Sequence, residues 1–226
     1  MRKIFLVILP ICLLLAGFSL LLYPTVSSAI NERHSSKAIQ SFTQQVQQVT
    51  DTHLQQQFAL AESYNRRLSG TVPDLSGTAD ADYFDILDFD GGMMGYLSVP
   101  VLDLELPIYH GTGTVALRKG VGHLPQSAFP IGGTGCHPVL VGHTGLPQAK
   151  LFTDLHKLRA GDTFSVTVGE QTVTYAVDQI KTVLPFETEA LRADPEEDFC
   201  TLVTCTPYGV NSHRLLVRGS RTGSAP

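Results

Sequence analysis

TLVTCTPYGVNSHRLLVRGSR, residues 201–221, joins two short apolar runs through a turn that contains proline and glycine. The runs Thr201–Thr204 and Leu215–Val217 are rich in β-branched and aliphatic residues, which predicts two strands. Cys205 follows the first run and Arg214 precedes the second. If the strands are neighbours, the thiol and the guanidinium lie side by side at one edge of a sheet. A thiolate beside a fixed cation is suited to covalent catalysis.

The same pattern of short apolar runs, separated by Gly, Pro and Asp, continues through most of the chain. The other predicted strands are Met94–Val99, Leu104–Ile108, Val139–Val141, Thr163–Val168, Thr172–Val177 and Ile180–Leu184. Gly169-Glu170 predicts a tight hairpin. Short helices are expected at Tyr83–Asp90 and, from the spacing of its apolar residues, at Ala149–Leu158. About eight short strands with few helices favour a β-barrel or a sandwich.

The N-terminal region, residues 1–30, contains about twenty residues without a charge, Ile4–Tyr23, after Arg2 and Lys3. At about 1.5 Å per residue, this helix would span about 30 Å, one hydrocarbon thickness of a membrane. The two basic residues predict a cytoplasmic N-terminus and place the rest of the chain outside. A cleaved signal peptide, with Ser27-Ser28-Ala29 as its small-residue site, is the alternative. Both interpretations predict an extracytoplasmic domain.

Ser35–Leu68 is polar and rich in glutamine, and its apolar residues recur at helical spacing. They are Ile39, Phe42, Val46 and Val49, followed after a slight phase shift by Phe58 and Ala61. An amphipathic helix is therefore predicted, capped by Ser35 or Ser36 and ended by Gly70. Residues 69–82 are small and polar and include Gly and Pro, which predicts a loop.

The composition narrows the possible functions. The formal net charge is −5, and the sequence contains no block of Lys and Arg, so nucleic-acid binding is not expected. No nucleotide, metal or organic cofactor motif occurs, so no cofactor is expected. Of the four cysteines, Cys12 lies in the apolar segment, which leaves Cys136, Cys200 and Cys205 in the exported part. This odd number argues against a disulfide framework and favours a free, reactive thiol.

Cys205 is the leading candidate nucleophile, and an inert cysteine at a strand end is the alternative. A thiol of ordinary pKa needs a base, and histidine is the usual one. His143 is the best candidate, because the apolar strand Val139–Val141 runs directly into Gly-His-Thr-Gly. Arg214 is preferred over the other arginines because it opens the strand next to Cys205, and a guanidinium can stabilise an oxyanion.

These residues resemble the signature of the sortases, and in particular of the class C, pilus-assembling branch. The resemblance covers roughly residues 83–221. Its segments occur in the class C order, and they are MMGYLSVPVLDLELPIYHGT, GVGHLPQSAFPIGG, VLVGHTGLPQAKLFTDL, AGDTF and TLVTCTPYGVNSHRLLVRG. The resemblance implies a mainly β fold, a closed eight-stranded sortase barrel with short helices, preceded by the amphipathic and transmembrane helices. It implies His143, Cys205 and Arg214 as catalytic residues, with Thr204 in the substrate and oxyanion surroundings.

The implied activity is transpeptidation. Cys205 would cleave an LPxTG-like sorting signal between Thr and Gly, and the thioacyl intermediate would pass to a pilin lysine, which polymerises pili. The implied enzyme is a monomer on the cell membrane, with one span and an extracytoplasmic catalytic domain. Its partners would be pilins or other LPxTG-bearing surface proteins. The alternatives are a sortase that attaches surface proteins to peptidoglycan and, from another class, a non-catalytic exported β-domain that binds a partner.

The sequence departs from the class C pattern in the loop. Class C enzymes usually carry an Asp-Pro-aromatic lid motif, whereas this chain has VPDLS at residues 72–76. Asp74 and Leu75 are the possible lid residues. The expected division is an anchor at 1–30, a helical approach with a lid-like loop at 31–92, the catalytic barrel at 93–221 and a disordered tail at 222–226.

Overall fold

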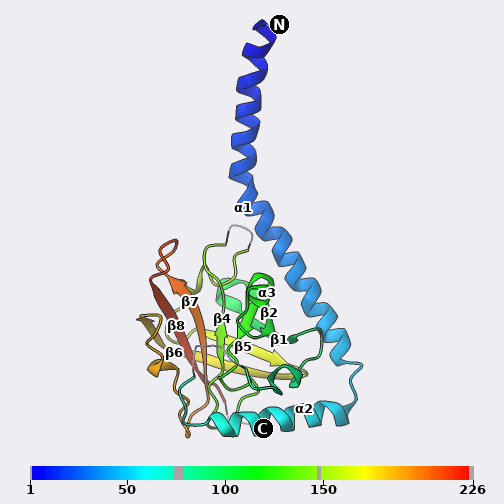
Figure 1. Cartoon of the computed structure of the whole chain (residues 1–226), viewed down its shortest axis with the longest axis vertical. Helices are drawn as coiled ribbons and strands as arrows, with labels where there is room; N and C mark the ends of the chain where they lie inside the picture. The colour runs from blue at the N-terminus through cyan, green and yellow to red at the C-terminus, as the bar shows by residue number, and fades with distance from the viewer. Residues whose placement is uncertain (1, 74–78, 147–148, 224–226) are drawn as a thin grey trace.

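The computed structural model describes residues 2–73, 79–146 and 149–223. The described residues form a closed barrel of eight strands in the order β1-β2-β3-β4-β7-β8-β6-β5 (Figure 1). The strands are β1 (Met93–Val99), β2 (Leu104–His110), β3 (Val121–His123), β4 (Val139–Val141), β5 (Thr163–Val168), β6 (Gln171–Val183), β7 (Phe199–Thr206) and β8 (His213–Arg221). The pairs β2–β3 and β4–β7 are parallel, and the others are antiparallel. The predicted mainly β barrel is confirmed.

Two features of the barrel differ from the prediction. The segments predicted as two strands, Thr172–Val177 and Ile180–Leu184, are covered up to Val183 by the single strand β6. This strand keeps its pairing with β8 across a register shift between Val177 and Gln179. β3 was not predicted, because it has only three residues and a central glycine. It is held by parallel pairing with β2 and antiparallel pairing with β4, two contacts that no local pattern reveals.

Two helices precede the barrel, but their bounds differ from those of the predicted apolar helix, Ile4–Tyr23, and the predicted amphipathic helix, Ser35–Leu68. α1 (Arg2–Val46) runs through the predicted serine caps without a break, so that helix start is wrong. α2 (Asp51–Leu68) begins after Thr50, whose side chain accepts a hydrogen bond from the backbone N–H of His53. Thr50 lies where the apolar stripe shifts phase, so the shift marks a helix break.

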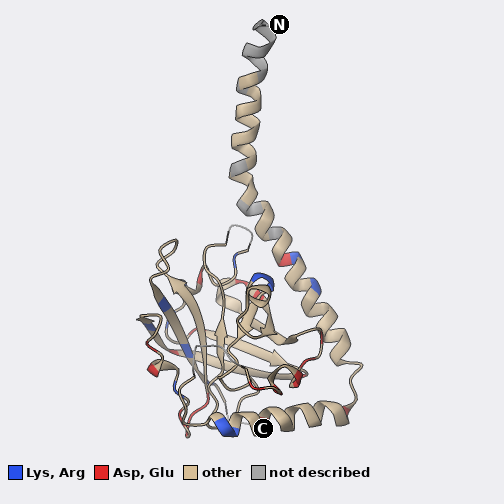
Figure 2. Ribbon diagram, viewed as in Figure 1, with Lys and Arg blue, Asp and Glu red and all other residues tan. Residues whose placement is uncertain are grey.

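α1 extends far beyond the barrel, and α2 lies across the opposite end of the domain (Figure 1). Where its side chains are described, the projecting part of α1 carries no charged residue before Glu32 (Figure 2). In the described chain, no one helix meets the length and hydropathy criteria for a membrane span. The segments Ile11–Tyr23 and Val26–Val46, which meet at an angle of 43°, satisfy them only as a pair.

The remaining helices are short. α3 (Thr114–Lys119) follows β2 and was not predicted. The described residues also form four 3₁₀ turns, η1 (Tyr83–Asp85), η2 (Pro100–Leu102), η3 (Leu155–Lys157) and η4 (Glu189–Leu191). A helix over Ala149–Leu158 was wrong: Leu151 has a φ of 37°, which interrupts any helix, and only η3 is helical. The apolar residues of that segment are nevertheless buried, as their spacing suggested.

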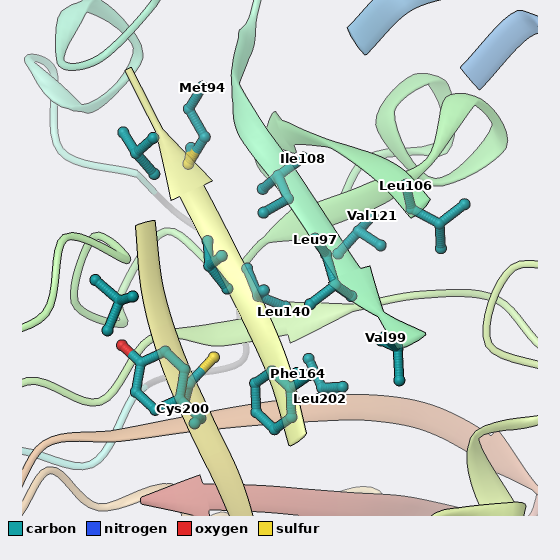
Figure 3. Close-up of a cluster of buried hydrophobic side chains, with 14 of the residues drawn as sticks. Met94, Leu97, Val99, Leu106, Ile108, Val121, Leu140, Phe164, Cys200 and Leu202 are labelled. Carbon is teal, nitrogen blue, oxygen red and sulfur yellow. The ribbon is translucent and has the colours of Figure 1, made fainter. Parts of the chain in front are cut away.

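The main core fills the barrel. Leu97, Ile108, Leu140, Phe164 and Leu202 reach it from five strands, and each is at most 1% exposed (Figure 3). Phe42 and Val46 of α1 and Ala61 of α2 pack onto the same core, as the helical stripe predicted.

A second, smaller apolar cluster lies on the other face of β4, β7 and β8, because successive side chains of a strand alternate between faces. It consists of Leu124, Val139, Leu191, Val203 and Leu216. This cluster forms the floor of the candidate site.

Candidate active site

Cys205 and Arg214 lie on neighbouring strands at one end of the barrel. In the antiparallel β7–β8 ladder they are directly paired, and both are half-buried. They share the strand faces of Val203 and Leu216, so both side chains emerge on the face of the second apolar cluster. Cys200, five residues before Cys205, faces the main core and is fully buried.

His143 is placed beside them by the parallel pairing of β4 with β7. Val141 pairs with Val203, and the backbone N–H of Gly142 donates to the carbonyl of Val203 at 3.0 Å. The Thr204 hydroxyl donates to the carbonyl of Gly142 at 2.8 Å. Continuing the register two residues beyond the Val141–Val203 pair brings His143 alongside Cys205. Because Phe152 N–H also donates to the carbonyl of His143 at 3.0 Å, the backbone of this histidine is fixed from both sides.

The guanidinium of Arg214 is held at the start of β8. Its Nη1 donates to the carbonyls of Asn211, at 3.2 Å, and of His213, at 3.0 Å. The described residues supply no acceptor for Nε or Nη2 of Arg214, so these donors remain for a ligand. A fixed cation with spare N–H groups is suited to binding a carbonyl or an oxyanion.

One cavity of about 320 Å³ is lined by His143, Cys205 and Arg214 together. Most of its other lining is apolar and includes the second cluster. The site therefore combines a thiol, an imidazole and a guanidinium above an apolar floor. Such a set can form and resolve a thioester, because sulfur attacks, imidazole moves a proton and guanidinium binds negative charge.

Comparison with known proteins identifies the family. The sortase domain model matches residues 97–222, more than half of the chain. The chain belongs to the sortase family.

Among solved structures, sortase C1 from Streptococcus agalactiae superposes on this sortase with a TM-score of 0.79 at 41% identity, covering 84% of this chain and 100% of that chain. A pilus-related sortase C of Group B Streptococcus has a TM-score of 0.75 at 37% identity, covering 81% and 96%. A curated relative, Sortase A of Bacillus anthracis, is 30% identical over 152 residues, 67% of this chain and 68% of its own length. The protein is a sortase transpeptidase whose structural neighbours are class C enzymes.

The other candidate residues lie as follows. Thr204 lines the cavity, but its hydroxyl is committed to Gly142, so in this sortase it joins β7 to the backbone that precedes His143. The proposed lid residues Asp74 and Leu75 lie outside the described residues. Within the described part of the chain, no group of three or more His, Cys, Asp or Glu residues is arranged to hold a metal ion.

Two other histidines of this sortase, His123 and His137, are buried. His137 donates from Nδ1 to the carbonyl of Arg192 and bonds through Nε2 to the Thr201 hydroxyl. Burial lowers its pKa to about 4. His123 donates from Nε2 to the carbonyl of Ala128, and burial lowers its pKa to about 3. Both rings are therefore neutral and structural near neutral pH.

Sequence reasoning missed the parts of the site that come from other elements. Leu117 of α3 lines the cavity, as do Leu184, Pro185 and Glu187 after β6. The Glu187 carboxylate accepts from the backbone N–H of Leu184 at 2.8 Å and so fixes this turn. No pattern marks these residues, because they meet the site only through the tertiary fold.

Proposed function

We propose that this sortase is a membrane-anchored class C enzyme that cleaves an LPxTG-like sorting signal between Thr and Gly and transfers the acyl group to a pilin lysine. The observation that carries the proposal is the direct pairing of Cys205 with Arg214 beside His143 on one apolar-floored cavity. The likeness to a structure described as a pilus-related sortase C favours pilins as the substrates.

In this mechanism the Cys205 thiolate attacks the carbonyl carbon of the threonine. The carbon–nitrogen bond to glycine then breaks, and His143 gives its proton to the leaving amine. The spare N–H groups of Arg214 bind the oxygen on which negative charge develops. A lysine amine of the next pilin replaces sulfur on the carbonyl carbon, which leaves an isopeptide bond and restores the free thiol.

The anchor is proposed for the N-terminal part of α1. Arg2 and Lys3 precede an uncharged stretch that extends to residue 31, and α1 carries this stretch away from the barrel (Figures 1 and 2). An enzyme held in this way, as a monomer with its barrel outside, would meet pilins that are themselves on the membrane.

The test is to mix the enzyme with a pilin that carries a sorting signal and to look for high-mass ladders. Ladders that disappear when the acceptor lysine of the pilin is replaced support polymerisation, whereas attachment of single subunits to peptidoglycan precursors would support wall anchoring instead. We expect His143→Ala and Arg214→Ala each to reduce turnover at least about a hundredfold, and Cys205→Ala to abolish it. Full activity of Cys205→Ala would refute Cys205 as the nucleophile, whereas a wild-type protein that neither cleaves the signal nor forms ladders would support the non-catalytic binding domain.

A further inference from the structure

A second cavity is also lined by Cys205. It has a volume of about 460 Å³ and is lined by residues after β4, around η3 and in the β7–β8 loop. Among described lining residues, the two cavities have only Thr204 and Cys205 in common. His143 and Arg214 line the first cavity, whereas His156 and Tyr208 line the second. Cys205 therefore lies where two separate cavities meet.

The second cavity has the lining that an alkyl ammonium group requires. Its described lining contains no lysine or arginine to repel a cation. Tyr208 supplies an exposed aromatic ring, which can pack against methylene groups and attract a cation at its face, and the buried Phe152 ring forms part of the wall. Thr144 adds a hydroxyl that can accept a hydrogen bond from an ammonium group. A lysine side chain combines a methylene stem with such a head group.

His156 can act as a base in this cavity. Its Nδ1 lies 3.0 Å from the carbonyl oxygen of Thr153. A carbonyl only accepts, so Nδ1 carries the proton in the neutral ring and Nε2 keeps a lone pair. The ring belongs to η3, which is fixed by the buried side chains of Leu155 and Leu158. His156 is exposed, so a proton taken up by Nε2 can pass to water.

We infer that the second cavity is the acceptor site, which binds the lysine amine that resolves the thioacyl intermediate, and that His156 deprotonates this amine. The inference rests on the proposed function, because it supplies the second substrate of that reaction. The donor keeps the first cavity, with its apolar floor and Arg214, while the acceptor approaches the same carbonyl carbon through the second.

In the resolving step, the lysine amine displaces the sulfur of Cys205 from the thioester. One proton of the lysine ammonium passes to Nε2 of His156 and then to water. The neutral nitrogen attacks the thioester carbon, a carbon–nitrogen bond forms, and the carbon–sulfur bond breaks with its electron pair returning to Cys205. The second proton of the nitrogen passes to that sulfur. The products are the isopeptide, the free thiol and one released proton.

The test separates acylation from its resolution. The full-length enzyme is given a fluorogenic LPxTG-like peptide and increasing amounts of a pilin domain that carries the acceptor lysine, and amide and hydrolysis products are measured together. For His156→Gln we expect the limiting ratio of amide to hydrolysis product to fall at least about tenfold, because a general base is lost. For Tyr208→Ala we expect the acceptor concentration at half-maximal ratio to rise about fivefold, while Tyr208→Phe, which keeps the ring, stays within about twofold of wild type.

His53→Gln, an exposed histidine on α2, is the matched control, and we expect its ratio to equal that of wild type. If the wild-type enzyme does not cleave the peptide, no acyl-enzyme forms and the proposed function fails. If cleavage proceeds and both His156→Gln and Tyr208→Ala partition like wild type, the proposed function stands and the acceptor site is refuted. If His156→Gln fails to fold, the comparison of Tyr208→Ala with Tyr208→Phe tests whether the second cavity is the acceptor site.

Discussion

Replacing Gly142 with alanine tests how the backbone before His143 is packed. A Cβ at position 142 would lie 2.5 Å from Cδ2, 2.7 Å from Cγ and 3.0 Å from Cε2 of the Phe152 ring. Carbon atoms in contact are normally about 3.5–4.0 Å apart, so ring or backbone must move by roughly 1 Å. Phe152 is only 1% exposed, and its ring has little room to move. Overpacking of this kind costs about 1–3 kcal/mol, which lowers Tm by about 2–4 °C for each kcal/mol in a domain of this size.

The activity should fall with the stability. Displacing the residue before His143 by roughly 1 Å misaligns the imidazole, and misplacement on this scale can cost up to about a hundredfold in rate. We therefore expect kcat/KM for peptide cleavage to drop at least about tenfold. Stability is measured by urea unfolding and cleavage by the fluorogenic peptide. Gly113→Ala is the control, because its added Cβ meets no atom within 4 Å.

A double-mutant cycle shows whether the Phe152 ring is the obstacle. Phe152→Leu removes the ring at a cost of about 1 kcal/mol on its own. In the Gly142→Ala/Phe152→Leu variant the added methyl group no longer meets the ring, so the combined loss should be smaller than the sum of the two by at least about 1 kcal/mol. Strictly additive losses, or a Gly142→Ala variant within about 0.5 kcal/mol of wild type, would refute this account.

Two further predictions follow from buried hydrogen bonds. Thr204→Val keeps the side-chain shape but leaves the carbonyl of Gly142 without its 2.8 Å donor, so we expect the free energy of unfolding to fall by about 1–3 kcal/mol. Thr204→Ser keeps the hydroxyl and should lie closer to wild type. If urea titrations show equal losses for the two variants, the hydrogen bond is not the cause. Burial holds the pKa of His137 at about 4 against 6.5 when unfolded, so the unfolded chain binds the extra proton and stability falls as pH drops from about 6.5 to 4. At about 1.4 kcal/mol per pKa unit this loss approaches roughly 3 kcal/mol. His137→Gln should therefore reduce the slope of unfolding free energy against pH in this range, where the buried His123 also contributes; an unchanged slope would contradict the prediction.

Several individual strands could be predicted because their residues form short apolar runs that end at Gly, Pro or Asp. Val139–Val141 and Thr163–Val168 have the predicted bounds. The errors occur where tertiary contacts override the pattern. β6 remains one strand because β8 pairs with it on both sides of the bulge, and β3 exists because β2 and β4 flank it. Likewise, the apolar spacing of residues 149–158 indicated burial correctly but helix wrongly, since a loop can bury the same side chains.

The candidate site was predictable to the same extent. Cys205, His143 and Arg214 each lie next to a strand end, and strand ends can be located from sequence. The distance of 62 residues between His143 and Cys205 is bridged by the parallel β4–β7 pairing, which sequence pattern did not reveal. The second cavity was not predicted, because its lining comes from loops whose conformation depends on tertiary packing; the Tyr208 ring, for example, leaves no room for a side chain at Gly145.

The topology explains why one sulfur can serve two substrates. β7 has a parallel neighbour, β4, and an antiparallel neighbour, β8. The end of β4 and the start of β8 therefore both lie beside the end of β7 that carries Cys205. Residues after β4 and residues of the β7–β8 loop line the second cavity, while the face of β4, β7 and β8 that carries the second cluster lines the first. A transpeptidase must hold its acyl group in place while another amine approaches the same carbon. A nucleophile buried in the middle of β7 would be reached from one face only, whereas Cys205, at the end of the strand, is open to both.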